Sequence, residues 1–333
     1  MKKTLLVVAL CVCVLSAAQA QKITGAGSTF DYPIFSKWFN EYSAAHPGVE
    51  INYQSIGSGG GIKQVCSGTV DFGASDMPMT DDLLKSCGVK LVQIPIVLGA
   101  DVPTYNVPGV TAELKFSQSV IADIFLAKIT NWNDPQIAKD NPGVHLPDQK
   151  IIVVHRSDGS GTTFIWTDFL SKVSKEWAGG PGKGTAVNWP TGVGGKGNEG
   201  VAGYVRQLPG SIGYVELIYA LQNHITYGSV QNAAGKFVKA SIDSVTAAGA
   251  TAKIPDDYRV SITNAPGADA YPVSSFSWML IPTHPTDMAK EKVIKDMLNW
   301  IDTSGESEVS TLSYAPLPEN LASRVLKTVY ALP

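Results

Sequence analysis

The chain has few of the residues that metal sites require. Its 333 residues include four cysteines, of which Cys11 and Cys13 lie in the first 20 residues. The other two, Cys66 and Cys87, have no histidine near them in the sequence. The five histidines, at 46, 145, 155, 224 and 284, do not show the short spacings typical of zinc ligands. The sequence therefore predicts neither a metal site nor a cofactor that depends on one.

A surplus of positive charge is also missing. The net charge is −3, and removing Lys2 and Lys3 from the 26 basic residues leaves 24 against 29 acidic ones, a net charge near −5. Nucleic-acid-binding proteins are usually basic, so this class is disfavoured. If the ligand is an anion, local dipoles and a few placed donors must bind it, because the overall field does not attract it.

Long hydrophobic runs are confined to the N-terminus and are short even there. Lys2 and Lys3 precede an apolar run from Thr4 to Ser16, and Ala18-Gln19-Ala20 fits a small-residue cleavage site. The run is shorter than the ~20 residues of a spanning helix. We therefore expect residues 1–20 to be a cleaved export signal and the mature chain to be a soluble protein, not a lipoprotein.

Cys66 and Cys87 remain after such a cleavage. An even number of cysteines in an exported protein favours a disulfide. Two buried free thiols are the alternative that the sequence leaves open.

Nucleotide-binding and hydrolase motifs are absent or incomplete. Gly192, Gly194 and Gly197 match G-x-G-x-x-G, but Trp189-Pro190 precedes them where a dinucleotide site needs an apolar strand. We expect a structural glycine loop there. The stretch from Gly57 fails as a P-loop because Ile62 and Gln64 occupy its second glycine and hydroxyl positions. No G-x-S-x-G elbow surrounds any serine.

Apolar runs alternate with helical patterns, which predicts an α/β fold. A strand, a turn of small or hydroxyl residues and a helix follow one another four times. The four turns are Ser28 to Phe30, Ser58, Asp76 and Arg156 to Thr162. Ligands of open α/β sheets bind beyond the carboxyl ends of the strands, so these turns could face one crevice.

The turn from Arg156 to Thr162 has the composition of an oxyanion site. It joins the apolar run Ile151–Val154 to a helical pattern, so the first N–H groups of that helix lack partners within the helix. Ser160 and Thr162 add hydroxyl donors, and the guanidinium of Arg156 suits a tetrahedral oxyanion. Asp158 is predicted to hold the guanidinium in place. A capped strand–helix turn without a ligand is the alternative.

Asp76 would repel an anion unless that anion carried a proton to donate. Phosphate near neutral pH can carry one, since the second pKa of a phosphate group lies near ~6 even when esterified, and sulfate carries none. A site built around such a bond can reject an analogue without the hydrogen by up to ~10⁴–10⁵-fold. The alternative, that Asp76 is an N-cap for the next turn, fits the sequence equally well.

Six segments in order resemble the periplasmic substrate-binding protein of the high-affinity phosphate ABC transporter, the PstS family. They span most of the chain after residue 20. The segments are Thr24–Phe30, Tyr53–Gly60, Val70–Asp76, Arg156–Thr162, Gly194–Gly200 and Ile212–Glu216. Gly99–Tyr105 departs from the more apolar run expected there, which leaves its strand geometry open. Cys66 and Cys87 lie outside the family motif.

The resemblance implies a two-lobed periplasmic-binding-protein fold of type II, with hinge-connected lobes of mixed sheets flanked by helices. Residues 21–98 plus 271–333 would form lobe 1, and residues 99–270 lobe 2. The implied phosphate ligands are Ser28, Thr29, Phe30, Ser58, Asp76, Arg156, Ser160, Gly161 and Thr162. Asp76 would accept the phosphate proton, and Asp158 would steady Arg156. Position 28 is often Ala in the family, and Ser keeps the backbone donor.

The implied function is capture of inorganic phosphate and its delivery to the membrane permease and ATPase subunits of an ABC transporter. The protein would be a monomer and not an enzyme. One alternative is a receptor for sulfate, molybdate or a phosphonate, although Asp76 argues against fully ionised ligands. A secreted phosphatase is disfavoured because no base–nucleophile pair is visible. A surface adhesin would not need converging donors.

Overall fold

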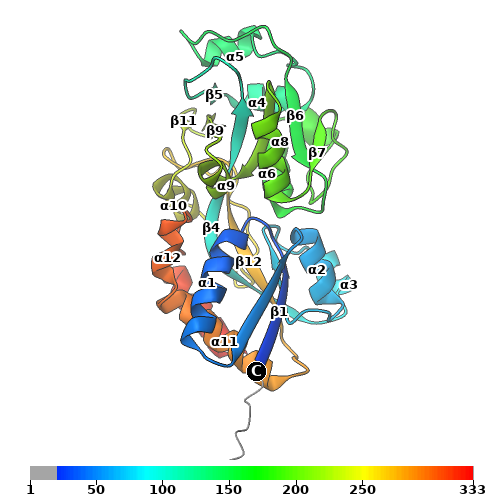
Figure 1. Cartoon of the computed structure of the whole chain (residues 1–333), viewed down its shortest axis with the longest axis vertical. Coiled ribbons are helices and arrows are strands. Elements are labelled where there is room, and N and C mark those ends of the chain that lie inside the picture. The colour runs from blue at the N-terminus through cyan, green and yellow to red at the C-terminus, as the bar shows by residue number, and fades with distance from the viewer. Residues whose placement is uncertain (1–20, 333) are drawn as a thin grey trace, which may run out of the picture.

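A computed structural model describes residues 21–332 (Figure 1). The chain forms two bodies stacked along the long axis of the molecule, which we call the lower and upper lobes as Figure 1 draws them. No helix within residues 21–332 is long and apolar enough to cross a membrane. The predicted signal segment, residues 1–20, lies outside the described residues.

The sheet of the lower lobe is mixed. Its strands are β1 (Gln21–Gly27), β2 (Val49–Ser55), β3 (Phe72–Ser75), β12 (Ser274–Pro282) and the first part of β4 (Leu91–Asn106). They lie in the order β2-β1-β3-β12-β4, with β1, β2 and β3 parallel and β12 antiparallel to both of its neighbours. The three parallel strands therefore end at the same edge of the sheet.

Helices make up the rest of the lower lobe. They are α1 (Tyr32–Ala45), α2 (Ser58–Cys66), α3 (Asp81–Ser86), α11 (Met288–Thr303), α12 (Glu306–Thr311) and α13 (Glu319–Tyr330). In α1 the apolar residues recur every three or four positions, so one face is buried; it contains Ile34, Phe35, Trp38, Phe39 and Tyr42. Pro33 stands in the first turn of α1, where its missing N–H has no helical partner to lose.

The upper lobe extends the same sheet. Its strands are the rest of β4, β6 (Ile152–Arg156), β7 (Val193–Gly195), β8 (Ser211–Glu216) and β9 (Thr226–Tyr227). A second sheet contains β5 (Lys115–Phe116), β10 (Ser229–Gln231) and β11 (Phe237–Val238). The helices are α4 (Gln118–Phe125), α5 (Pro135–Asp140), α6 (Gly161–Val173), α7 (Lys175–Gly179), α8 (Gly197–Gln207), α9 (Leu217–Gln222) and α10 (Ile242–Ala250).

Strand β4 connects the two lobes. Residues 91–100 pair with β12, and residues 101–106 pair with β8 (Figure 1). The segment Gly99–Tyr105, whose geometry the sequence left open, is continuous strand, although it buries the polar side chains of Asp101 and Thr104. The two-lobed α/β fold is as predicted, while the predicted residue division of the lobes stays a prediction.

The glycine segment after Pro190 is partly extended. Residues Val193–Gly195 form β7, which pairs in parallel with β6, where we expected a loop. Pairing with β6 supplies the regular backbone hydrogen bonds that this glycine-rich sequence does not suggest on its own. Cys66 at the end of α2 and Cys87 after α3 form a disulfide, with their Cα atoms 4.8 Å apart.

Candidate functional site

The four turns selected from the sequence lie between the two lobes. Ser28, Thr29 and Phe30 follow β1, Ser58 begins α2, and Asp76 follows β3. From the upper lobe, Arg156 ends β6, and Ser160 caps α6, which begins at Gly161 and Thr162. All of these residues are buried.

The two lobes meet at glycines in this region. The backbone N–H of Gly59 donates to the carbonyl oxygen of Gly159 at 2.9 Å. A side chain on Gly161 would collide with the carboxylate of Asp76 and the hydroxyl of Ser58. The structure therefore describes a closed arrangement, in which donors from both lobes surround Asp76.

Asp76 accepts hydrogen bonds from three serines. Its Oδ1 accepts from the hydroxyls of Ser28 at 2.5 Å and Ser277 at 2.7 Å, and its Oδ2 accepts from that of Ser58 at 3.3 Å. Burial raises the pKa of Asp76 to about 6, although the serines and the charge of Arg156 act to lower it. A carboxylate offers about four acceptor positions, so one on Oδ2 remains for a further donor.

A second buried acid, Asp31, shares Ser277 with Asp76. The Ser277 hydroxyl lies 2.5 Å from Oδ2 of Asp31 and 2.7 Å from Oδ1 of Asp76. One hydroxyl hydrogen cannot bridge to both carboxyls, so the group needs another proton. Burial and the neighbouring charge of Asp76 raise the pKa of Asp31 well above its usual range. The extra proton therefore resides on Asp31, which leaves Asp76 as the acceptor.

Arg156 is held in a fixed orientation. Its Nε and Nη2 donate to the two carboxylate oxygens of Asp158, at 2.9 and 2.6 Å, and its Nη1 donates to Thr162 Oγ1 at 3.1 Å. Burial acts to raise the pKa of Asp158, but Arg156 outweighs it, and the pKa is lowered. Asp158 also accepts from the N–H of Gly197 at 3.0 Å. Because Asp158 binds both nitrogens on one edge of the guanidinium, the remaining donors of Arg156 point in a defined direction.

The start of α6 provides backbone donors. The hydroxyl of Ser160 accepts from the N–H of Thr163 at 3.0 Å, so Ser160 is a helix cap as well as a predicted ligand. Gly161 and Thr162 open the helix, where N–H groups have no partner within the helix and the dipole favours an anion. This turn and Arg156 suit a small oxyanion.

Three residues at this site were not predicted from the sequence. Ser277 and Asp31 belong to the proton-sharing group around Asp76, and Asn198 contacts both Thr29 and Thr162. Asp31 directly follows the Ser28–Phe30 turn, and Asn198 lies inside one of the segments that carried the resemblance. Their places in the sequence could therefore have indicated that both lie at the site. Ser277 had no such signal, because it is 201 residues from Asp76 in the chain.

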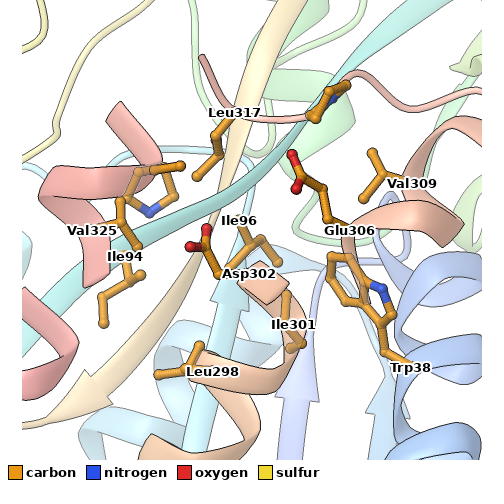
Figure 2. A pocket seen from close by; sticks show the side chains of 13 residues that line it. Trp38, Ile94, Ile96, Leu298, Ile301, Asp302, Glu306, Val309, Leu317 and Val325 are labelled. Atoms are coloured by element: carbon orange, nitrogen blue, oxygen red, sulfur yellow. The ribbon is translucent and has the colours of Figure 1, made fainter. Parts of the chain in front are cut away.

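A cavity elsewhere in the lower lobe is of a different kind (Figure 2). It has a volume of about 30 Å³ and lies among mainly apolar side chains, including Trp38, Ile94, Leu298 and Val325. None of the predicted site residues lines it. Within residues 21–332 no cluster of three or more His, Cys, Asp or Glu side chains could hold a metal ion.

The fold and the closed cleft define a two-lobed solute-binding protein. A model of the PBP superfamily domain matches residues 15–301. The phosphate-binding protein PstS of Pasteurella multocida is 50% identical over 310 residues, covering 92% of this chain and 89% of that protein. PstS of Xylella fastidiosa (strain Temecula1) is 49% identical over 307 residues, covering 91% and 84%. The chain belongs to the PstS family of phosphate-binding proteins.

Solved structures show the same fold at lower identity. A phosphate-binding protein from Stenotrophomonas maltophilia aligns with a TM-score of 0.71 at 18% identity, covering 92% of this chain and 94% of that one. A putative phosphate ABC transporter substrate-binding protein from Clostridium perfringens, solved with bound phosphate, aligns with a TM-score of 0.67 at 18% identity, covering 90% and 100%.

The raised pKa of Asp76 predicts how stability depends on pH without ligand. The folded protein binds this proton more tightly than the unfolded chain, so stability is highest below the unfolded pKa near ~4 and falls as pH rises through about 6. We expect Asp76 to contribute a loss of up to about 3 kcal/mol in the free energy of unfolding across this range, at ~1.4 kcal/mol per pKa unit, with the full value for the closed arrangement and a smaller one where an open cleft lets water reach the carboxylate. Urea unfolding of the wild type and Asp76→Asn should show the decline reduced by this amount in the variant. An unchanged decline would contradict the assignment.

Proposed function

We propose that this protein captures inorganic phosphate between its lobes in the periplasm and delivers it to the membrane permease and ATPase subunits of an ABC transporter. Asp76 is the observation that carries the proposal. It is a buried acceptor that three serine hydroxyls bond, with one acceptor position left on Oδ2, beside the start of α6. Membership of the PstS family supports the same ligand.

The donors and the acceptor together select a protonated tetrahedral anion. Arg156, the hydroxyls of Thr29, Ser160 and Thr162, and the N–H groups of Thr29, Phe30, Ser58, Gly161 and Thr162 serve the unprotonated oxygens. Ser28, predicted as a ligand, donates its hydroxyl to Asp76 and its N–H to the carbonyl oxygen of Ala74, so it acts on the ligand only through Asp76. The remaining acceptor position of Asp76 takes the hydrogen of the phosphate. Sulfate or molybdate would face the same carboxylate with no hydrogen to offer, which leaves a buried charge repelled and one hydrogen bond unmade.

The lobes would work as rigid units on a hinge. We propose residues 21–98 plus 271–333 as one unit and 99–270 as the other, turning about the strands that join them. The protein acts as a monomer, without a cofactor and without catalysing a reaction. The relatives are named as binding proteins, which supports a receptor rather than an enzyme.

A phosphatase is the alternative function, and a short assay can test it. Ser28 lies 2.5 Å from Asp76, so a serine and a base are adjacent, as nucleophilic catalysis would require. The Asp76 carboxylate is already shared among three serines, which makes it an acceptor in a network rather than a free base. We expect no release of p-nitrophenol from p-nitrophenyl phosphate at high protein concentration. Multiple turnovers that vanish in Ser28→Ala would establish the enzyme instead.

Asp76 should decide between phosphate and sulfate. Asp76→Asn replaces an acceptor oxygen by a donor NH₂, which suits a fully ionised oxyanion and leaves the phosphate hydrogen without a partner. We expect the ratio of sulfate to phosphate dissociation constants to fall by at least ~100-fold in calorimetric titrations. Asp302→Asn, a carboxyl at the separate cavity of Figure 2, is the matched control and should leave the ratio unchanged. Equal affinities of the wild type for the two anions would sink the proposal.

We expect that the lobes can close fully only if residue 159 is a glycine, which has no Cβ. A Cβ there would lie 3.2 Å from the Cα of Gly59 across the cleft, whereas an opened cleft would leave it free. We expect Gly159→Ala to weaken phosphate binding about tenfold, through ~1–3 kcal/mol of overpacking in the closed form alone. The control is Gly203→Ala, where a Cβ would meet nothing within 4 Å. Thermal unfolding without phosphate should match the wild type for Gly159→Ala, so a large loss of stability would argue against a closing role.

A further inference from the structure

Asn198, the second residue of α8, is fully buried beside the proposed phosphate site but is not among its predicted ligands. Its side-chain amide lies between hydroxyls from both lobes. The Nδ2 atom is 2.8 Å from Thr29 Oγ1, in the lower lobe, and 3.1 Å from Thr162 Oγ1, in the upper lobe. Asn198 therefore spans the cleft as well as lining it.

The orientation of this amide is fixed by a backbone donor. The N–H of Glu216 lies 2.9 Å from Asn198 Oδ1. A backbone N–H can only donate, so the side-chain atom that faces it has to be the oxygen. The NH₂ group must consequently face the two threonines, and it can only donate to them.

The donors around each threonine determine where its own hydrogen can go. Thr162 Oγ1 accepts from Asn198 Nδ2 and from Arg156 Nη1, both at 3.1 Å. Thr29 Oγ1 accepts from the Nδ2 and the backbone N–H of Asn198, at 2.8 and 3.3 Å. A hydroxyl has two acceptor positions and one hydrogen. With both acceptor positions of each oxygen occupied, the hydrogens of Thr29 and Thr162 are left to donate to another group.

We propose that Asn198 is a positioning residue that makes the Thr29 and Thr162 hydroxyls obligatory donors to the bound anion, one from each lobe. This proposal rests on the proposed function. The amide sets the polarity of both hydroxyls before the ligand arrives, so binding does not have to reorient them. It also ties the donor orientation to closure, because Thr29 meets Asn198 only when the lobes come together.

Two substitutions separate this role from a merely structural one. Asn198→Asp keeps the oxygen that accepts from Glu216 N–H but replaces the NH₂ by an acceptor, toward which both hydroxyls would turn. Asn198→Ala removes the amide and leaves the hydroxyls free to rotate. We expect phosphate binding to weaken about tenfold in Asn198→Ala and at least ~100-fold in Asn198→Asp. A structural role predicts the opposite order, since Asp retains the bond to Glu216 and Ala does not.

A double-mutant cycle tests whether Asn198 acts through the two threonine hydroxyls. In a Thr29→Val/Thr162→Val background there are no hydroxyls to orient, so Asn198→Ala should change phosphate affinity by less than about twofold. In the wild-type background, Asn198→Ala should weaken phosphate binding by the full factor of about ten. Equal factors in the two backgrounds, or tighter binding by Asn198→Asp than by Asn198→Ala, would overturn the proposal.

Unfolding without phosphate checks that each variant is folded. If Asn198→Ala does not fold, Asn198→Asp must weaken binding at least as much as the double valine variant does, and a smaller loss would overturn the proposal. Calorimetry of the wild type with inorganic phosphate is the reference. If the wild type itself does not bind phosphate, the proposed function fails, whereas wild-type binding with the wrong order of variants refutes only the role of Asn198.

Discussion

The buried carboxylate of Asp76 is the constraint on which the site depends. A charge removed from water is costly unless it is hydrogen-bonded, and three serine hydroxyls from separate parts of the chain supply those bonds. Asp31 keeps a proton so that its own charge does not add to the cost. The arrangement leaves one acceptor position in surroundings made of donors. The selectivity that we propose depends on this single free acceptor position, which only an anion carrying a hydrogen can fill.

The low charge of the sequence agrees with this design. Binding an anion with one guanidinium, hydroxyls and helix-start N–H groups requires that each donor points in a defined direction, since no strong field compensates for misalignment. The structure provides that control through neighbouring side chains. Asp158 fixes the plane of Arg156, and Asn198 fixes the hydroxyls of two threonines. The directions of the donors, rather than a net positive charge, therefore determine how the site binds an anion.

Much of the fold and part of the site could be predicted because the relevant signals are local. Strand, turn and helix follow one another within a few residues, so Ser28, Ser58, Asp76 and Arg156 could be placed at strand ends. Ser277 could not, because its role depends on β12 returning beside β3 late in the chain. Strand β4 also runs through Asp101 and Thr104, where tertiary pairing overrides the polar sequence.

Strand β4 has a consequence for how the molecule comes apart. The same strand is hydrogen-bonded to β12 in the lower lobe and to β8 in the upper one. The two sets of pairs use different residues of β4, 91–100 and 101–106, so each lobe holds one half of a covalently continuous strand. The turning that we propose keeps both halves of β4 paired, whereas unfolding of one lobe would loosen the adjoining end of the half that the other lobe holds. The strand about which we propose that the lobes turn therefore also couples the unfolding of one lobe to that of the other.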